Sequence, residues 1–149
     1  MPEKKTATKA ARAKRQGKSA STQAGEYVHE EIKHVREGKH GARSAKQAIA
    51  IGLSKARRAG VKATPSKTAS KATKKKAAQD TKAAKKRSSG TATKKSTARK
   101  RASTKALKRE GTAAASKRAL SAQAKKSASK RTSASKSAAA KKAAKTKGA

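Results

Sequence analysis

The side chains most able to do chemistry in this chain are three histidines, His29, His34 and His40. Two histidines on one helix bind zinc when they are four residues apart, because that spacing puts both rings on the same face. His29 and His34 are five residues apart, which is about 140° around a helix, and His40 follows in a glycine-containing loop. The spacing therefore predicts no metal site, and instead a solvated helix face on which Glu30 pairs with His34.

A second group of reactive side chains is made of glutamates in the same stretch: Glu26, Glu30, Glu31 and Glu37. Acid–base catalysis needs carboxylates in a partly apolar pocket, and the surrounding sequence has too few large apolar residues to form one. We therefore expect no catalytic residue, no cofactor and no enzyme activity. We expect these carboxylates to hold lysines of the C-terminal tail or of a second copy. Gly17-Lys18-Ser19 ends like a phosphate-binding loop but lacks the upstream glycine, so nucleotide binding is not predicted.

The dominant chemical feature is positive charge, with 44 Lys and Arg residues against 7 acidic residues and a formal net charge of +37. Like charges at this density oppose compaction and require a polyanion to neutralise them. Solubility alone does not need so large an excess of one sign. The predicted DNA-binding residues are two helix-end arginines and the basic clusters of the C-terminal half: Arg57, Arg58, Lys74, Lys75, Lys76, Lys85, Lys86, Arg87, Lys94, Lys95, Arg99, Lys100, Arg101, Lys108, Arg109, Lys117, Arg118, Lys125, Lys126, Lys130, Arg131, Lys141 and Lys142.

Composition limits what else the chain can be. Alanine supplies most of the 32% hydrophobic fraction, and eight of the eleven large apolar residues fall between residues 27 and 61. There is no cysteine, which excludes disulfides and cysteine-based zinc sites. The single aromatic residue, Tyr27, leaves little on which nucleic-acid bases could stack. No secretion signal or transmembrane run is recognisable, so we expect a cytoplasmic protein on the nucleoid, or a nuclear one if the source is eukaryotic.

Charge and apolar content divide the chain into three expected segments. Residues 1–23 carry a net charge of +6, residues 24–61 a net charge of +4, and residues 62–149 a net charge of +27. The first is expected to be a basic disordered arm, the second a helical hairpin and the third a disordered tail of Lys, Ala, Ser and Thr. The expected fold class is therefore mostly disordered with a small all-α segment. The tail would be helical only in part or on binding, over stretches such as Thr97–Glu110 and Ala113–Lys145.

The middle segment carries signals for two helices. Ala24, Val28, Ile32 and Val35 form one apolar stripe, which predicts a helix from about Gly25 to Glu37. The second helix begins at a capping box, Ser44 with Gln47, and ends at Gly60, which suits the left-handed position after a helix. Its face of Ala, Ile, Leu and Gly is small enough for a partner helix to approach closely. A simple helix stop at Thr64-Pro65-Ser66-Lys67 is favoured over a histone-type phosphorylation unit.

Two resemblances follow from these residues. The tail, with its Lys-Lys-Ala-Ala, Ala-Ala-Lys-Lys and Ser-Lys-Arg clusters, resembles the C-terminal domains of linker histones and the Lys/Ala-rich bacterial histone H1-like, nucleoid-associated proteins. Those proteins bind DNA without strong sequence preference. The middle stretch, from His29 through Gly38 and from Lys46 to Gly60, is similar to a short bacterial domain of unknown function found in small, very basic proteins. That similarity implies a bacterial source and no particular chemistry.

Together these features predict sequence-nonspecific binding and compaction of double-stranded DNA by phosphate neutralisation, leading to chromosome condensation. One alternative is an RNA-binding or ribosome-associated role, because lysine-rich segments do not sense the 2′-hydroxyl. Another is a protein-interaction module, the hairpin, with a tail that only localises it; weak self-association through the hairpin belongs to this alternative. Membrane-surface binding is disfavoured because the basic clusters lack an apolar face to insert.

Overall fold

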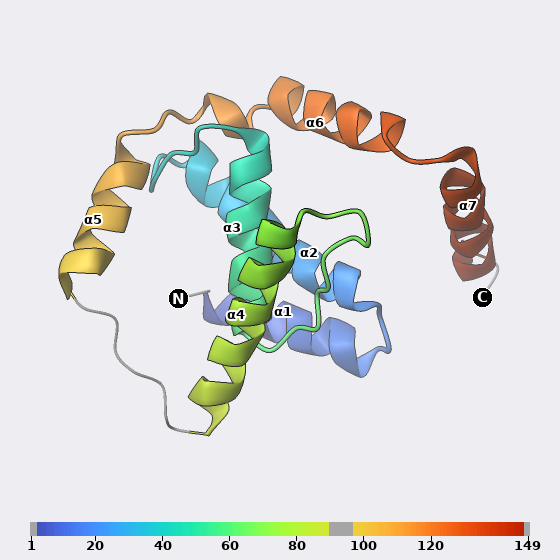
Figure 1. Ribbon diagram of the computed structural model, residues 1–149, viewed down its shortest axis with the longest axis horizontal. Coiled ribbons are helices and arrows are strands. Elements are labelled where there is room, and N and C mark those ends of the chain that lie inside the picture. The colour runs from blue at the N-terminus through green and yellow to red at the C-terminus, as the bar shows by residue number, and fades with distance from the viewer. Residues whose placement is uncertain (1–2, 90–96, 148–149) are drawn as a thin grey trace.

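The computed structural model describes residues 3–89 and 97–147, apart from the side chains of residues 87, 88, 142, 146 and 147. Within these residues the chain is helical and contains no strand. The elements are α1 (Lys4–Arg15), α2 (Ala20–Arg36), α3 (Ala45–Arg58), α4 (Lys71–Ser88), α5 (Thr97–Lys108), the 3-10 helix η1 (Ala113–Ala115), α6 (Lys117–Ser129) and α7 (Ser133–Lys147). Figure 1 shows α1 to α4 gathered into a compact group, which together with η1 we call the body, with α5 and α7 as outer helices on either side.

The α2–α3 hairpin forms the centre of the body. Ser44 caps α3 by accepting a hydrogen bond from Gln47 N at 3.2 Å, as the capping box predicts. After α3, Gly60 adopts φ +92°, and Val61 N donates to Ala56 O at 3.1 Å, which closes the expected left-handed helix end. α2 begins five residues earlier than predicted, because Ser19 caps it through Thr22 N.

Close approach of the two hairpin helices depends on the absence of a side chain at Gly52. A Cβ atom at this position would lie only 2.6 Å from Val28 Cα of α2. Ala48 and Ala56, one turn to either side, are fully buried. The small-residue face predicted for this helix therefore brings the two backbones together.

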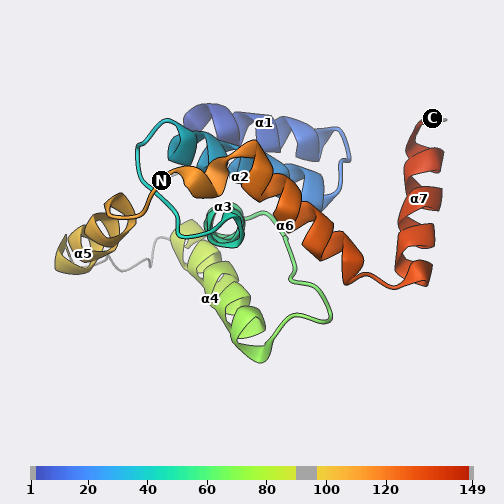
Figure 2. The ribbon, with the colours of Figure 1, turned by 90° about the horizontal axis from the view of Figure 1, so that it is seen from above.

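α1 packs along α2, as Figure 2 shows. Its buried residues, Thr6, Ala10 and Ala13, recur at intervals of three and four and so share one face. Ala10 lies in a buried cluster with Tyr27 and Ala56. The N-terminal segment is thus a packed helix in the structure, and not the disordered arm expected from its charge.

α4 packs against α3 through a buried carboxylate. Asp80 is 1% exposed and accepts hydrogen bonds from Arg58 Nε at 2.8 Å and Ser54 Oγ at 2.7 Å. Ala77, one turn before Asp80, is buried on the same face. The first part of the expected tail is therefore joined to the hairpin by specific tertiary contacts.

Further along the chain, η1 covers the opposite end of the hairpin. Ala115 is fully buried in a cluster with Val35 and Ala48, and its carbonyl accepts a hydrogen bond from Arg36 Nε at 2.8 Å. The segment before η1 is also attached, because the α2–α3 loop donates backbone hydrogen bonds from Gly41 N to Leu107 O and from Ala42 N to Gly111 O. Neither outer helix packs against another helix among the described residues.

The expectation of a mostly disordered chain is therefore wrong. Among the described residues, α1, α4, α5, η1, α6 and α7 are regular elements in segments where disorder was predicted. The prediction assumed that burial requires large apolar side chains. The body instead buries alanines, which allow backbones to approach closely, and satisfies buried charges such as Asp80 with hydrogen bonds.

Candidate nucleic-acid interface

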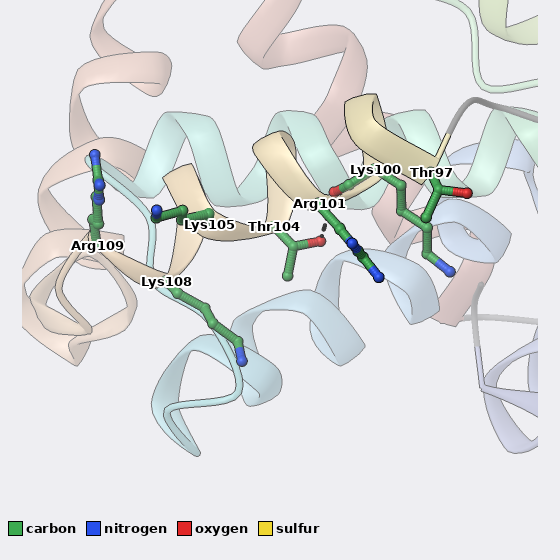
Figure 3. A pocket seen from close by; sticks show the side chains of 7 residues that line it. All are labelled: Thr97, Lys100, Arg101, Thr104, Lys105, Lys108 and Arg109. Carbon is green, nitrogen blue, oxygen red and sulfur yellow. Dashed lines mark hydrogen bonds between the residues drawn. The ribbon is translucent and has the colours of Figure 1, made fainter.

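A basic surface with a shallow groove lies along α5. Its shallow groove is lined by Thr97, Lys100, Arg101, Thr104, Lys105, Lys108 and Arg109, all of them exposed (Figure 3). The positions from 97 to 108 recur at intervals of three and four, so these side chains share one helix face. Thr104 Oγ1 donates to Lys100 O at 3.0 Å, which ties this threonine to its own helix. With no acid on α5, the charge on this face is positive and has no acidic side chain of the same helix to offset it.

Most of the other predicted residues lie on exposed surfaces of different helices. Those between residues 71 and 147 whose side chains the structure describes, outside the groove, are exposed: Lys74, Lys75, Lys76, Lys85, Lys86, Arg99, Lys117, Arg118, Lys125, Lys126, Lys130, Arg131 and Lys141. Lys94 and Lys95 lie outside the described residues, and so do the side chains of Arg87 and Lys142. The structure therefore distributes the predicted set over four helices and brings only the α5 residues together in one groove.

The two arginines at the end of α3, Arg57 and Arg58, form hydrogen bonds or ion pairs with other residues of the protein. Arg57 is 8% exposed and donates from Nε to Ala63 O at 2.6 Å. Arg58 pairs with the buried Asp80. Both arginines have structural partners that DNA would have to displace, so we leave them out of the candidate interface.

Sequence inspection missed Lys105, although it lies in the middle of the α5 face. The prediction selected runs of adjacent basic residues, whereas Lys105 stands alone in the sequence. Counting by helical period would have found it, because Lys105 is four residues after Arg101 and three before Lys108.

The acidic residues are concentrated in the body and are already paired. Six of the seven lie within 4.0 Å of a basic group, and Glu26 alone forms no such pair among the described residues. Residues 97–147 contain 17 basic residues and one acid, a net charge of +16. Most of the excess positive charge is therefore carried outside the α1–α3 region, because residues 62–149 account for +27 of the total of +37. Among the described residues, Glu37 at the end of α2 pairs with Lys33 and Lys39, and Glu30 and Glu31 pair with Lys55, so these glutamates contact lysines of the body where tail lysines were expected. The expected contact with a second copy stays a prediction.

Hydrogen bonds at the edge of the body shift several pKa values. The His34 ring and then Lys39 lower the pKa of Glu3 below its ordinary value. Lys39 also lowers the pKa of Glu37, and this partnership raises the pKa of Lys39. Burial raises the pKa of the Tyr27 hydroxyl. None of these groups is among the residues that line the α5 groove.

Comparison with known proteins gives one match. Residues 5–68 match the model of a family of unknown function, DUF6496. The matched segment covers α1, α2 and α3 and ends shortly before α4, which agrees with α1 being part of the body. It is broader than the middle stretch for which a bacterial domain of unknown function was expected. Residues 69–149, which contain the α5 groove, lie beyond the match.

No curated protein and no solved structure matches the chain. The resemblance to histone H1-like proteins therefore rests on composition alone. Among the described residues, no helix is both long enough and apolar enough to cross a membrane.

Proposed function

We propose that this protein binds double-stranded nucleic acid, principally DNA, without sequence specificity, and that it does so by neutralising phosphates with the exposed basic helices. The observation that carries the proposal is the one-sided cationic face of α5, which lies on a helix with no acidic residue. Lysines and arginines placed on phosphates release condensed counterions, and this release drives binding that does not depend on sequence. Under this proposal the protein acts in the cytoplasm on the bacterial nucleoid.

Burial of the only aromatic side chain favours a duplex over a single strand as the ligand. Tyr27 is 2% exposed and packs between α1, α2 and α3. Proteins that bind single strands stack bases on exposed aromatic rings, and this chain has none to offer. Contacts to the phosphate backbone remain, and these carry no sequence information.

The arrangement of the basic helices supports compaction as well as binding. Figures 1 and 2 show the outer helices α5 and α7 at opposite ends of the molecule, with the body between them. Two cationic helices at opposite ends of the molecule could contact two duplex segments at once. Bridging of this kind would draw DNA together in the manner of a histone-like protein.

Coverage of the hairpin argues against its serving mainly as a dimerisation module. Its small-residue faces are already covered by α1, by α4 and by η1. The proposal therefore needs no second copy of the chain.

The proposed test is a salt titration of duplex binding by the full-length chain. Affinity should fall steeply as salt rises, with the logarithm decreasing by about 0.9 per phosphate contact for each tenfold increase. In a variant with Lys100, Arg101, Lys105 and Lys108 all changed to Gln, the slope of log affinity against log salt concentration should become shallower by up to about 3.6.

The matched control changes four exposed lysines on α1 (Lys4, Lys5, Lys9 and Lys14) to Gln and so removes the same charge. It should lose less of the slope than the α5 variant. Equal losses would contradict the α5 interface, and no binding at low salt would contradict the function itself. Competition by duplex RNA at matched salt then decides between DNA and the RNA-directed alternative.

A further inference from the structure

The fold brings together three potential metal ligands that the sequence separates. Glu31 and His34 lie three residues apart on α2 and so share one face, and the α2–α3 loop returns His40 to the same place. One donor atom from each residue lies within 4.8 Å of the others. The spacing argument compared His29 with His34, whereas the structure combines His34 with a histidine from the loop.

Glu31 provides a buried carboxylate at the centre of this group. Its side chain is 1% exposed, and neither carboxylate oxygen has a hydrogen-bond partner among the described residues. The contacts it does make are ionic, from Lys55 to Oε2 and from His40 to Oε1. A buried carboxylate is costly unless cations compensate it. Lys55 supplies such a cation at Oε2, whereas Oε1 faces the His40 ring.

The contact between Glu31 and His40 itself calls for a cation. His40 Nδ1 lies 3.2 Å from Gly41 O, and this carbonyl can only accept a hydrogen. In the neutral ring Nδ1 then carries the hydrogen, so Nε2 presents a lone pair to Glu31 Oε1 at 3.1 Å. Two acceptors facing each other at this distance repel unless a proton or a metal ion lies between them. The separation is close to the roughly 3.3 Å between two ligands of tetrahedral zinc.

Both histidines also have the outer partners that metal-binding histidines need. His40 is held by the Gly41 carbonyl, and His34 Nε2 lies 2.9 Å from Glu3 Oε1. In metalloproteins a carbonyl or carboxylate of this kind fixes the orientation of the ring and its tautomer. The carboxylate of Glu3 comes from the start of α1, so this contact connects α1 to the group.

We propose that Glu31, His34 and His40 bind a divalent transition-metal ion of the zinc type. Two imidazoles and one carboxylate suit Zn²⁺ and Co²⁺, and they are a poor set for Mg²⁺ or Ca²⁺, which take oxygen ligands. A bound ion would join α2 to the α2–α3 loop directly and to α1 through Glu3. Its role is structural: it clamps the body that carries the basic helices.

Lys55 is the internal competitor of the metal. Its ammonium pairs with Glu31 Oε2 and lies 3.7 Å from Glu30 Oε1. A metal on Glu31 would repel the ammonium, and Glu30 offers it another partner nearby. Replacing Lys55 with Met should therefore strengthen metal binding while weakening the metal-free protein.

The test is titration of the full-length chain with Co²⁺ and Zn²⁺, followed by cobalt absorption, calorimetry and the thermal midpoint. The wild type should bind one ion, and the cobalt spectrum should be that of a low-coordinate site with nitrogen ligands. His40→Gln should lower the affinity by more than about 10-fold, and Glu3→Gln by about 10- to 100-fold as an outer partner.

His29→Gln is the matched control, because His29 is a histidine on the same helix that lies outside the group. It should bind metal as the wild type does. Circular dichroism of each variant establishes that it folds, and Lys55→Met should show a larger metal-induced rise in thermal midpoint than the wild type. No saturable binding, equal loss in His29→Gln and His40→Gln, or a smaller rise in Lys55→Met would each overturn the proposal.

Discussion

The body and the outer helices α5 and α7 are built from similar residues, yet among the described residues the body helices pack against one another whereas α5 and α7 pack against no other helix. Alanines of the body, such as Ala48 and Ala115, are fully buried, whereas those of α7 are exposed or at most partly buried where the structure describes them. The difference lies in the residues between the alanines. Gly52, Asp80 and Glu31 occur in the body and allow close approach or pair buried charge. Alanine and lysine alone produce a helix but no core.

The largest expected contrast between the two regions is in amide hydrogen exchange. Amides of α3 should exchange only when the body unfolds, while those of α7 should exchange through local opening, because no packing stabilises a helix of 15 residues. Protection factors in α3 should exceed those in α7 by several orders of magnitude. Exchange monitored on the same sample by NMR checks this, and similar protection in both helices would show that α7 has a stabilising partner.

Removal of the buried charge at Asp80 should have the next largest effect. Asp80→Asn weakens two hydrogen bonds to a 1% exposed carboxylate, so the free energy of unfolding should fall by about 2 to 3 kcal/mol. Urea denaturation measures the change. The control is Glu110→Gln, whose ion pair with Arg43 is 30% and 82% exposed and contributes less than about 1 kcal/mol. If both variants lost the same free energy of unfolding, the Asp80 contacts would stabilise the protein no more than an exposed ion pair does.

A pair of glycine substitutions sharpens the comparison within α2 and α3. Gly52→Ala places a Cβ against Val28 Cα, and this overpacking should cost about 1 to 3 kcal/mol. Gly25 lies within α2, and a Cβ added there would meet no atom within 4 Å beyond its chain neighbours and its own stretch of helix backbone, so Gly25→Ala should instead stabilise the helix by about 0.5 to 1 kcal/mol. Thermal unfolding of both variants reveals the sign, and a neutral Gly52→Ala would contradict the close helix contact.

The smallest expected effect concerns the exposed end of α2. Lys39 and Lys33 lower the pKa of Glu37 below its ordinary value of 4.5, so the folded state favours the charged carboxylate. The resulting stability is present above the ordinary pKa and is lost as pH falls through the lowered pKa of the folded state. The thermal midpoint of the wild type should exceed that of Glu37→Gln slightly at neutral pH and converge with it in acid. A difference that persists in acid would exclude this ion pair as its cause.

Local signals in the sequence predicted part of this structure. Ser44 and Gly60 marked the ends of α3, because helix caps depend on the type of the residues at the helix ends. The packing of α1, α4 and η1 was not predictable in the same way. Each packs through alanine, such as Ala10 or Ala115, and alanine is equally common in the unpacked α7. Nothing in the residues around Asp80 indicates that it meets Arg58, because that contact depends on the path of the intervening chain.

The α5 face could have been found from helical period, and the histidine–glutamate group could not. His40 joins Glu31 only because the turn after α2 folds back on the helix. Residue spacing along a single helix does not indicate where a following loop places its side chains. Exposed charge was therefore the easier part of the candidate sites to predict, and buried charge the harder.

The two backbone hydrogen bonds from Gly41 and Ala42 to Leu107 and Gly111 connect positions more than sixty residues apart. With Arg36 bound to the Ala115 carbonyl, they fasten the C-terminal third of the molecule to the hairpin independently of the covalent link through residues 89–97. A chain nicked within that link would thus keep its two fragments together as a non-covalent complex. The hydrogen bonds therefore form a second connection between the hairpin and the basic C-terminal end, in addition to the covalent chain.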